Sequence, residues 1–157
     1  MAILLRAVTP ADESFLLQVY AGTRAAEMAL TPWDTAQRDA FLQMQFAAQT
    51  QSYWSQYPRS VHQIIEADGR PVGRVWVARR DGNIHILDIA LLPESNADIG
   101  AQIVADLMRE GEAAQQSVSI YLEAFDPAQS VFEQLGFKPV EQTGFHCLMQ
   151  WQPDIPN

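Results

Sequence analysis

The segment from Ile84 to Met108 constrains the fold of this chain more than any other. Residues 84–92 are almost all apolar, and a short polar loop, 93–98, follows them. Apolar side chains then recur at helical spacing, at Ile99, Ile103, Val104, Leu107 and Met108. The pattern predicts a strand covered on both faces, a loop and a helix. The free amides and positive dipole end of such a helix form a site for an anionic ligand.

The first third of the chain is predicted to be mainly helical. Ile3 to Ala7 is a short apolar run typical of a strand, and Thr9-Pro10 is a helix start. A short helical piece is expected over 24–29. A long helix is expected from Thr35 to about Tyr57, with Asp34 as its cap. The apolar positions of this long helix spread over more than one face. They indicate either a broad core face with exposed aromatic residues or a helix that also lines a groove.

The period then changes to two, which predicts strands over 61–67, 72–80 and 84–92, joined at Asp68-Gly69 and Asp81-Gly82. A strand over 118–125 follows the helix by a crossover, so it should lie parallel to the third of these strands. A short helix capped by Asp126 and a final hairpin over 137–140 and 145–151 complete the chain. We therefore expect one domain, 1–157, of α/β (α+β) class. Its mainly antiparallel central sheet has about seven strands, with helices on both faces.

The net charge of −9 limits the partners of the chain. An acidic surface disfavours nucleic acid and anionic membranes, and it favours a cationic substrate such as an amine. No apolar run is long enough to span a membrane. A single cysteine, Cys147, cannot form an internal disulfide, so we expect a cytoplasmic location. His62, His85 and His146 lie on separate strands without metal-ligand spacing, and we interpret them as surface or packed side chains with no metal site.

Three polar side chains within predicted strands are candidates for catalysis. Asp88 interrupts an apolar strand, and burial would raise the pKa of its carboxyl toward the range of a general base. Glu123 and Tyr121 alternate on the 118–125 strand, where Glu123 is a second candidate base and Tyr121 a candidate proton donor. Each also has a structural interpretation: a hydrogen-bonded aspartate, a polar residue at a strand end, and a core tyrosine.

The order of elements, the sequence ALLPE after a buried strand and the segment DPAQSVFEQLGFKPVE resemble the GNAT superfamily of acyl-CoA-dependent N-acyltransferases. The resemblance extends from Leu4 to Trp151. It implies that acetyl-CoA lays its pantetheine arm along the backbone of Ile89, Ala90, Leu91 and Leu92. It also implies that the pyrophosphate lies at the following loop and helix start, at Ser95, Asp98, Ile99, Gly100 and Ala101. An amine of a small molecule or peptide would enter from the opposite side, near Trp33 and Trp54.

The sequence departs from the family pattern at two places. Where the phosphate loop of the family has its first glycine, this chain has Asp98, and only Gly100 matches. A carboxylate repels phosphate, whereas an aspartate before a helical run is a common N-cap. The position of the family's proton-donating tyrosine is Phe132, which cannot donate a proton. Asp126 stands where the family often has asparagine.

Two functions follow from the sequence. The first is an N-acetyltransferase that uses acetyl-CoA and an amine acceptor. The second is a catalytically degenerate GNAT-fold protein that has lost CoA binding and acts as a binding or assembly module. The sequence leaves the acceptor and the oligomeric state open, a homo-oligomer included.

Overall fold

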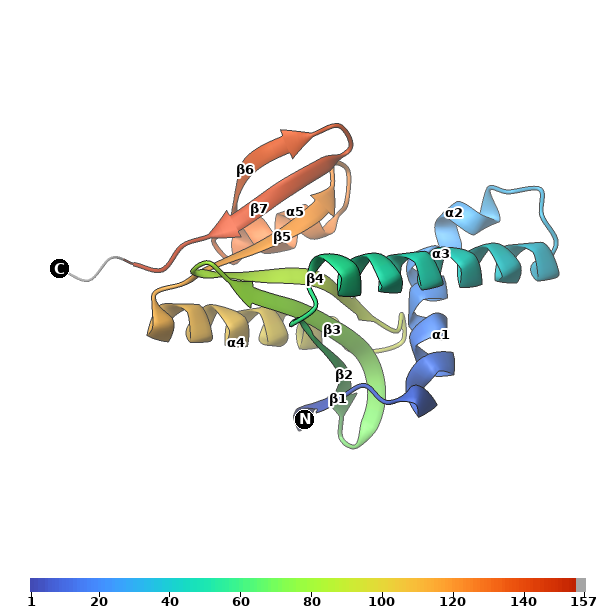
Figure 1. Cartoon of the computed structure of the whole chain (residues 1–157), viewed down its shortest axis with the longest axis horizontal. Coiled ribbons are helices and arrows are strands. Elements are labelled where there is room, and N and C mark those ends of the chain that lie inside the picture. The colour runs from blue at the N-terminus through green and yellow to red at the C-terminus, as the bar shows by residue number, and fades with distance from the viewer. Residues whose placement is uncertain (155–157) are drawn as a thin grey trace. The chain divides into compact units, whose positions relative to one another are not determined.

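The computed structural model describes residues 1–154; the remainder of the predicted domain, 155–157, lies outside the described residues. The elements follow in the order β1 (Ile3–Ala7), the 3-10 helix η1 (Pro10–Asp12), α1 (Glu13–Thr23), α2 (Ala25–Ala29), α3 (Thr35–Gln56), β2 (Val61–Ala67), β3 (Arg70–Arg80), β4 (Asn83–Leu91), α4 (Asp98–Ala114), β5 (Ser117–Glu123), α5 (Ala128–Gln134), β6 (Lys138–Thr143) and β7 (His146–Trp151) (Figure 1).

The strands form a seven-stranded sheet in the order β1-β2-β3-β4-β5-β7-β6. The pairs β1–β2, β5–β7 and β6–β7 are antiparallel, whereas β4 and β5 are parallel. The parallel pair confirms the crossover predicted from the sequence, because α4 connects its two strands. The mixed, mainly antiparallel α/β class is likewise confirmed.

The chain forms two compact units, and the β3 and β4 strands contribute to both. The first unit comprises residues 1–75 and 89–95, and the second comprises 76–88 and the residues from 96 onward. That the whole chain acts as one domain stays a prediction. No helix within residues 1–154 combines the length and apolar character needed to cross a membrane.

In the first unit, the long helix α3 begins where the sequence places its cap. The side chain of Asp34 accepts a hydrogen bond from the Gln37 amide at 2.8 Å and starts α3, as predicted. Tyr20 of α1, Met28 of α2 and Leu42 of α3 are buried together, with Trp33 and Phe41 packed against them. This cluster joins the three helices to one another.

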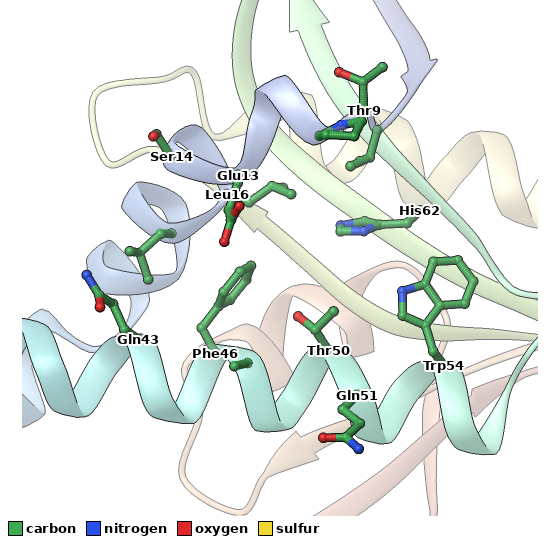
Figure 2. Close-up of a pocket in the computed structure, with 14 residues that line it drawn as sticks. Thr9, Glu13, Ser14, Leu16, Gln43, Phe46, Thr50, Gln51, Trp54 and His62 are labelled. Carbon is green, nitrogen blue, oxygen red and sulfur yellow. The ribbon is translucent and has the colours of Figure 1, made fainter.

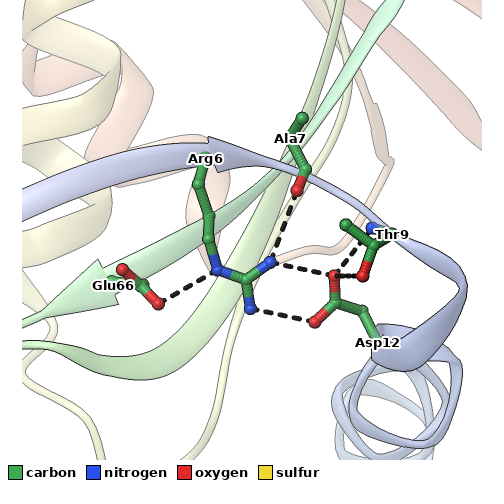
Figure 3. Close-up of polar contacts among 5 residues, drawn as sticks. All are labelled: Arg6, Ala7, Thr9, Asp12 and Glu66. Atoms are coloured by element: carbon green, nitrogen blue, oxygen red, sulfur yellow. Dashed lines mark hydrogen bonds and ion pairs between the residues drawn. The ribbon is translucent and has the colours of Figure 1, made fainter.

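A network of charged side chains fixes the connection between β1 and η1 (Figure 3). The Arg6 guanidinium donates to both carboxylate oxygens of Asp12 at 2.9 Å and to Glu66 of β2 at 3.0 Å. The Asp12 carboxylate also accepts a bond from the Thr9 amide at 2.8 Å. These hydrogen bonds, with Arg6 first and Thr9 second, hold the pKa of Asp12 well below its usual range. The network thereby anchors η1 and the start of α1 to the sheet.

Two glycines bring the end of β4 close to its neighbours in the first unit. A Cβ at Gly73 of β3 would lie 2.3 Å from the carbonyl oxygen of Ala90 and 2.7 Å from the Leu91 side chain. Gly22 of α1 faces Pro93, whose Cδ lies 3.7 Å from the position of a Cβ. Gly22 does not end α1, which continues to Thr23.

In the second unit, α4 buries the apolar side chains that its sequence predicted, Ile99, Ile103, Val104 and Leu107. Gly111 lies against Gln116 and Val118, where a Cβ would meet the Gln116 carbonyl oxygen at 2.6 Å. The β5 strand ends earlier than predicted, at Glu123, because the Asp126 amide bonds the Glu123 carbonyl and turns the chain. Phe125 therefore lies outside the strand and is exposed.

Candidate functional site

The first unit contains a pocket of about 870 Å³ (Figure 2). One wall comes from η1 and α1, through Pro10, Glu13, Leu16 and Leu17, and the opposite wall comes from α3. His62 of β2 closes one end. Ligand pockets typically enclose about 300–1,000 Å³. The pocket therefore has the size of a small-molecule or side-chain binding site.

The long helix α3 lines this pocket because its apolar residues cover more than one face. Leu42 is buried in the cluster with Tyr20, whereas Phe46, Thr50 and Trp54 line the pocket. Figure 2 shows the Trp54 indole and the His62 ring projecting into the pocket from different elements. The groove-lining interpretation of this helix is the one that the structure supports.

Glu13 and His62 are the titratable side chains that line the pocket. Glu13 is exposed in the first turn of α1, and its carboxylate projects into the pocket (Figure 2). Burial, and then the charge of Arg74, lower the pKa of His62 to about 4, while Asp12 acts in the opposite direction. His62 is therefore neutral near pH 7, and Glu13 supplies the negative charge.

A buried arginine lies behind the aromatic wall. Arg74 is 1% exposed, donates from Nη2 to Gln49 Oε1 at 2.8 Å, and places its guanidinium 5.4 Å from the Phe46 ring centroid. A cation at this distance from an aromatic ring is attracted by the ring's quadrupole. Arg74 thus positions Phe46 and also provides a positive field at the His62 end of the pocket.

One hydroxyl at the pocket wall has its hydrogen-bonding capacity unused. Thr50 Oγ1 is buried and has no hydrogen-bond partner among residues 1–154. A buried polar atom without a partner is uncommon and costs free energy. A ligand that offers a hydrogen bond would satisfy it.

The two tryptophans expected near the acceptor occupy different surroundings. Trp54 lines the pocket and is partly exposed. Trp33 packs against Phe41, with ring centroids 4.9 Å apart, in the cluster that joins the helices. The structure therefore places Trp54, but not Trp33, on the pocket wall.

The predicted catalytic residues lie in the second unit. Asp88 is half-buried on β4, whereas Glu123 is exposed and pairs with His146 of β7. Tyr121 is 51% exposed and meets His85 edge-on, with ring centroids 5.4 Å apart. Tyr121 is thus not the core tyrosine of the structural interpretation. The catalytic roles of all three stay predictions.

His85 and Ser119 form a polar pair beside Tyr121 that the sequence did not predict. His85 Nδ1 lies 2.8 Å from Ser119 Oγ, and Asn83 Nδ2 donates to the same oxygen at 2.9 Å. Burial first, and the charge of Arg80 second, lower the pKa of His85. The pair depends on the β4–β5 register, His85 opposite Ser119, which the sequence does not reveal.

The strand expected to carry the pantetheine arm, β4, continues beyond the segment that pairs with β5. The parallel pairing of β4 with β5 covers Asn83–Ile86 and Ser117–Ile120, and β4 itself extends to Leu91. Within the first unit, the Leu92 amide bonds the Val72 carbonyl at 2.8 Å, so this amide is already used. Ser95 closes a turn, because its amide and its hydroxyl both bond the Leu92 carbonyl.

The start of α4 differs from the sequence prediction. Asp98 is the first residue of the helix rather than its cap. The Asn96 side chain accepts a bond from the Asp98 amide at 2.9 Å, and the Asn96 carbonyl accepts from the Ile99 amide at 3.1 Å. The N-cap interpretation of Asp98 was therefore wrong, because Ala97 is the residue that precedes the helix and Asn96 supplies the acceptor for the Asp98 amide.

These residues form an unfavourable site for a pyrophosphate. Two amides at the helix start already have acceptors within the loop, and Asp98 is exposed beside them. Residues 93–101 contain no lysine or arginine. Gly100 and Ala101 lie in the first turns of α4, so the backbone has the expected form. The charge and the two occupied amides therefore both oppose the ligand.

The residues expected at the thiolate end serve structural roles within the second unit. Phe132 is buried and packs edge-on against Phe137, with ring centroids 5.0 Å apart. Asp126 Oδ1 accepts a bond from the Ala128 amide at 2.9 Å and starts α5. Cys147 is buried and His146 is exposed. Among residues 1–154, no group of three histidine, cysteine or acidic side chains converges as metal ligands.

Comparison with known proteins identifies the class. The model of the acetyltransferase (GNAT) family matches residues 26–137, more than half of the chain, and the chain belongs to that family. A comparison with curated protein sequences gives no match.

Solved structures show the same fold at low sequence identity. PaiA N-acetyltransferase from Thermoplasma acidophilum, in complex with coenzyme A, is 14% identical over 97% of this chain and 99% of its own, with a TM-score of 0.71. An acetyltransferase from Thermus thermophilus is 16% identical over 97% of each chain, with a TM-score of 0.67. A ribosomal-protein alanine N-acetyltransferase from Escherichia coli is 15% identical over 99% of this chain and 97% of its own, with a TM-score of 0.63.

Proposed function

We propose that this protein is an N-acyltransferase that moves an acetyl group from acetyl-CoA to an amine of a small molecule or peptide, and that it holds the donor weakly. The observation that carries the proposal is the family match over residues 26–137. The pocket between α1 and α3 supports it by offering an acceptor site. One solved structure of the same fold contains coenzyme A.

The start of α4 is the reason for weak donor binding. Two like charges about 4 Å apart cost roughly 1 kcal/mol in water and about 4 kcal/mol at a protein surface. Asp98 is exposed where the resemblance implies the pyrophosphate, and no basic side chain in 93–101 offsets its charge. We expect the affinity for acetyl-CoA to rise when this charge is removed.

The test is calorimetric titration of acetyl-CoA into the wild type and two variants. Asp98→Asn removes the charge and keeps the Cβ, and Asp98→Gly also restores the glycine of the family pattern. We expect Asp98→Asn to bind about fivefold or more tightly than the wild type. Asp98→Gly should bind at least as tightly as Asp98→Asn. Glu112→Gln, an equal charge change at an exposed position in the C-terminal half of α4, is the control and should bind like the wild type.

A second candidate function is the degenerate binding or assembly module. The specific observations in its favour are the Asn96 cap on the Asp98 amide and the buried Phe132. This function predicts no heat with millimolar acetyl-CoA for the wild type and for both Asp98 variants. Saturable binding together with acetyl transfer to any amine would exclude it.

A further inference from the structure

The pocket in the first unit has an uneven charge distribution. Among its lining residues in the described part of the chain, Glu13 carries the formal negative charge, and lysine and arginine do not occur. A carboxylate or phosphate on a ligand would therefore find no cationic partner on the pocket wall. An ammonium group would find one carboxylate.

The remaining surface of the pocket is apolar with neutral polar groups. Leu16, Leu17, Phe46 and Trp54 supply the apolar surface. The Thr50 hydroxyl adds a neutral hydrogen-bonding group. This lining suits the hydrocarbon or aromatic body of an amine.

The field of Arg74 defines which end of the pocket takes the cation. Its guanidinium lies against the Phe46 ring, and its charge lowers the pKa of His62. At His62 the charge of Arg74 acts more strongly than the opposing charge of Asp12, so the net field disfavours an ammonium there. Glu13 lies on the opposite wall, on α1, and its carboxylate projects into the pocket (Figure 2). The favourable position for the cation is therefore beside Glu13, with the apolar body toward Phe46 and Trp54.

We propose that this pocket is the acceptor site for a primary amine with an apolar body and without any carboxylate or phosphate, and that Glu13 holds its ammonium group. The assignment rests on the proposed N-acyltransferase function. It narrows the acceptor to one class and places amino acids, phosphorylated amines and nucleotide sugars outside that class.

Binding to the full chain without any donor tests the assignment separately from catalysis. The probes are 2-phenylethylamine, the neutral 2-phenylethanol, phenylalanine and 3-phenylpropionate, which share one body and differ in charge. Binding is followed by calorimetry and by the NMR signal of the Trp54 indole N–H, assigned with Trp54→Phe. We expect the amine to bind about tenfold more tightly than the alcohol and phenylalanine, with the carboxylate weakest.

Variants at Glu13 test whether its carboxylate causes the preference for the amine. Glu13→Gln should bring the amine to the affinity of the alcohol, a loss of about tenfold, and Glu13→Arg should make 3-phenylpropionate the preferred probe. Glu112→Gln is the matched control and should keep the wild-type order. Thermal unfolding of each variant verifies the fold. Equal binding of amine and alcohol to the wild type, or an unchanged preference in folded Glu13→Gln, overturns the assignment.

A transfer assay with acetyl-CoA distinguishes failure of the acceptor-site assignment from failure of the proposed acyltransferase function. If 2-phenylethylamine and phenylalanine are acetylated equally well, the acceptor class is wrong and the acyltransferase function holds. If the amine binds through Glu13 and no amine is acetylated, the pocket assignment holds as a binding site and the acyltransferase function fails.

Discussion

The side chain of Asn96 accepts a hydrogen bond at 2.9 Å from the backbone amide of Asp98, the first residue of α4. This contact uses a donor at the helix end where the family resemblance implies a pyrophosphate. An N-cap acceptor typically stabilises a protein by about 1 kcal/mol. The loop therefore supplies its own acceptor for this amide.

Asn96→Ala should lower the free energy of unfolding by about 1 kcal/mol because the Asp98 amide loses its acceptor. Urea denaturation followed by circular dichroism measures the change. Asp34→Ala, which removes the cap of α3, should cost a similar amount and serves as the comparison. A change below a few tenths of a kcal/mol in Asn96→Ala alone would show that water replaces this cap without loss.

Gly73→Ala should destabilise the protein by about 1–3 kcal/mol or more. The added Cβ would lie 2.3 Å from the Ala90 carbonyl oxygen, and backbone must move to admit it. Gly22→Ala is the matched control, because its Cβ meets Pro93 at an ordinary 3.7 Å. In a helix this change should stabilise by up to about 1 kcal/mol. Equal denaturation midpoints for the two variants would contradict the close approach of β3 and β4.

Asp12→Asn should reduce stability near neutral pH and flatten its acid dependence. The Arg6 hydrogen bonds lower the pKa of Asp12 in the folded state, so their contribution is complete above the ordinary value of 3.8. It is lost as the pH falls from there through the folded-state pKa. Unfolding midpoints between pH 2 and 6 measure this window. A wild type and variant with parallel acid profiles would contradict the role of the pair.

His62 should make the stability of the protein depend on pH in a second, higher range. Its pKa of about 4 in the folded state lies below the ordinary 6.5, so the unfolded chain takes up the proton first. Stability should therefore be complete above about pH 6.5 and should decline as the pH falls toward 4. His62→Gln should weaken this dependence, and NMR titration of the imidazole gives the pKa directly. A measured pKa near 6.5 would show that burial and Arg74 do not act on the ring.

Much of the fold could be predicted from the sequence because its elements carry their own local signals. Each of these signals is local. They are the Asp34 cap, the apolar stripe of α4 and the turns at Asp68-Gly69 and Asp81-Gly82. The prediction was wrong where a neighbouring residue competes for the same role. Asn96 supplies the side-chain acceptor that Asp98 was expected to provide, and a turn at Asp126 ends β5 before Phe125.

The pocket was less predictable than the fold. Glu13 has the sequence signature of an acidic residue in a first helical turn, and His62 that of a strand residue. Neither signal distinguishes a pocket wall from an ordinary surface. Two features indicated that α3 lines a groove: the breadth of its apolar surface, and the place that the family resemblance gave to Trp54.

The sequence by itself determined the element types and the acidic character of the α4 loop, because propensity, periodicity and charge act over a few neighbouring residues. It indicated the family through the resemblance of its motifs. Only the tertiary structure decided which side chains meet across the chain. It placed Glu13, His62 and Trp54 around one pocket and set Arg74 behind Phe46. The physical reason is that burial, strand register and the field of a distant charge depend on contacts between residues far apart in sequence. Those contacts turn an exposed glutamate and a neutral histidine into parts of a candidate acceptor site.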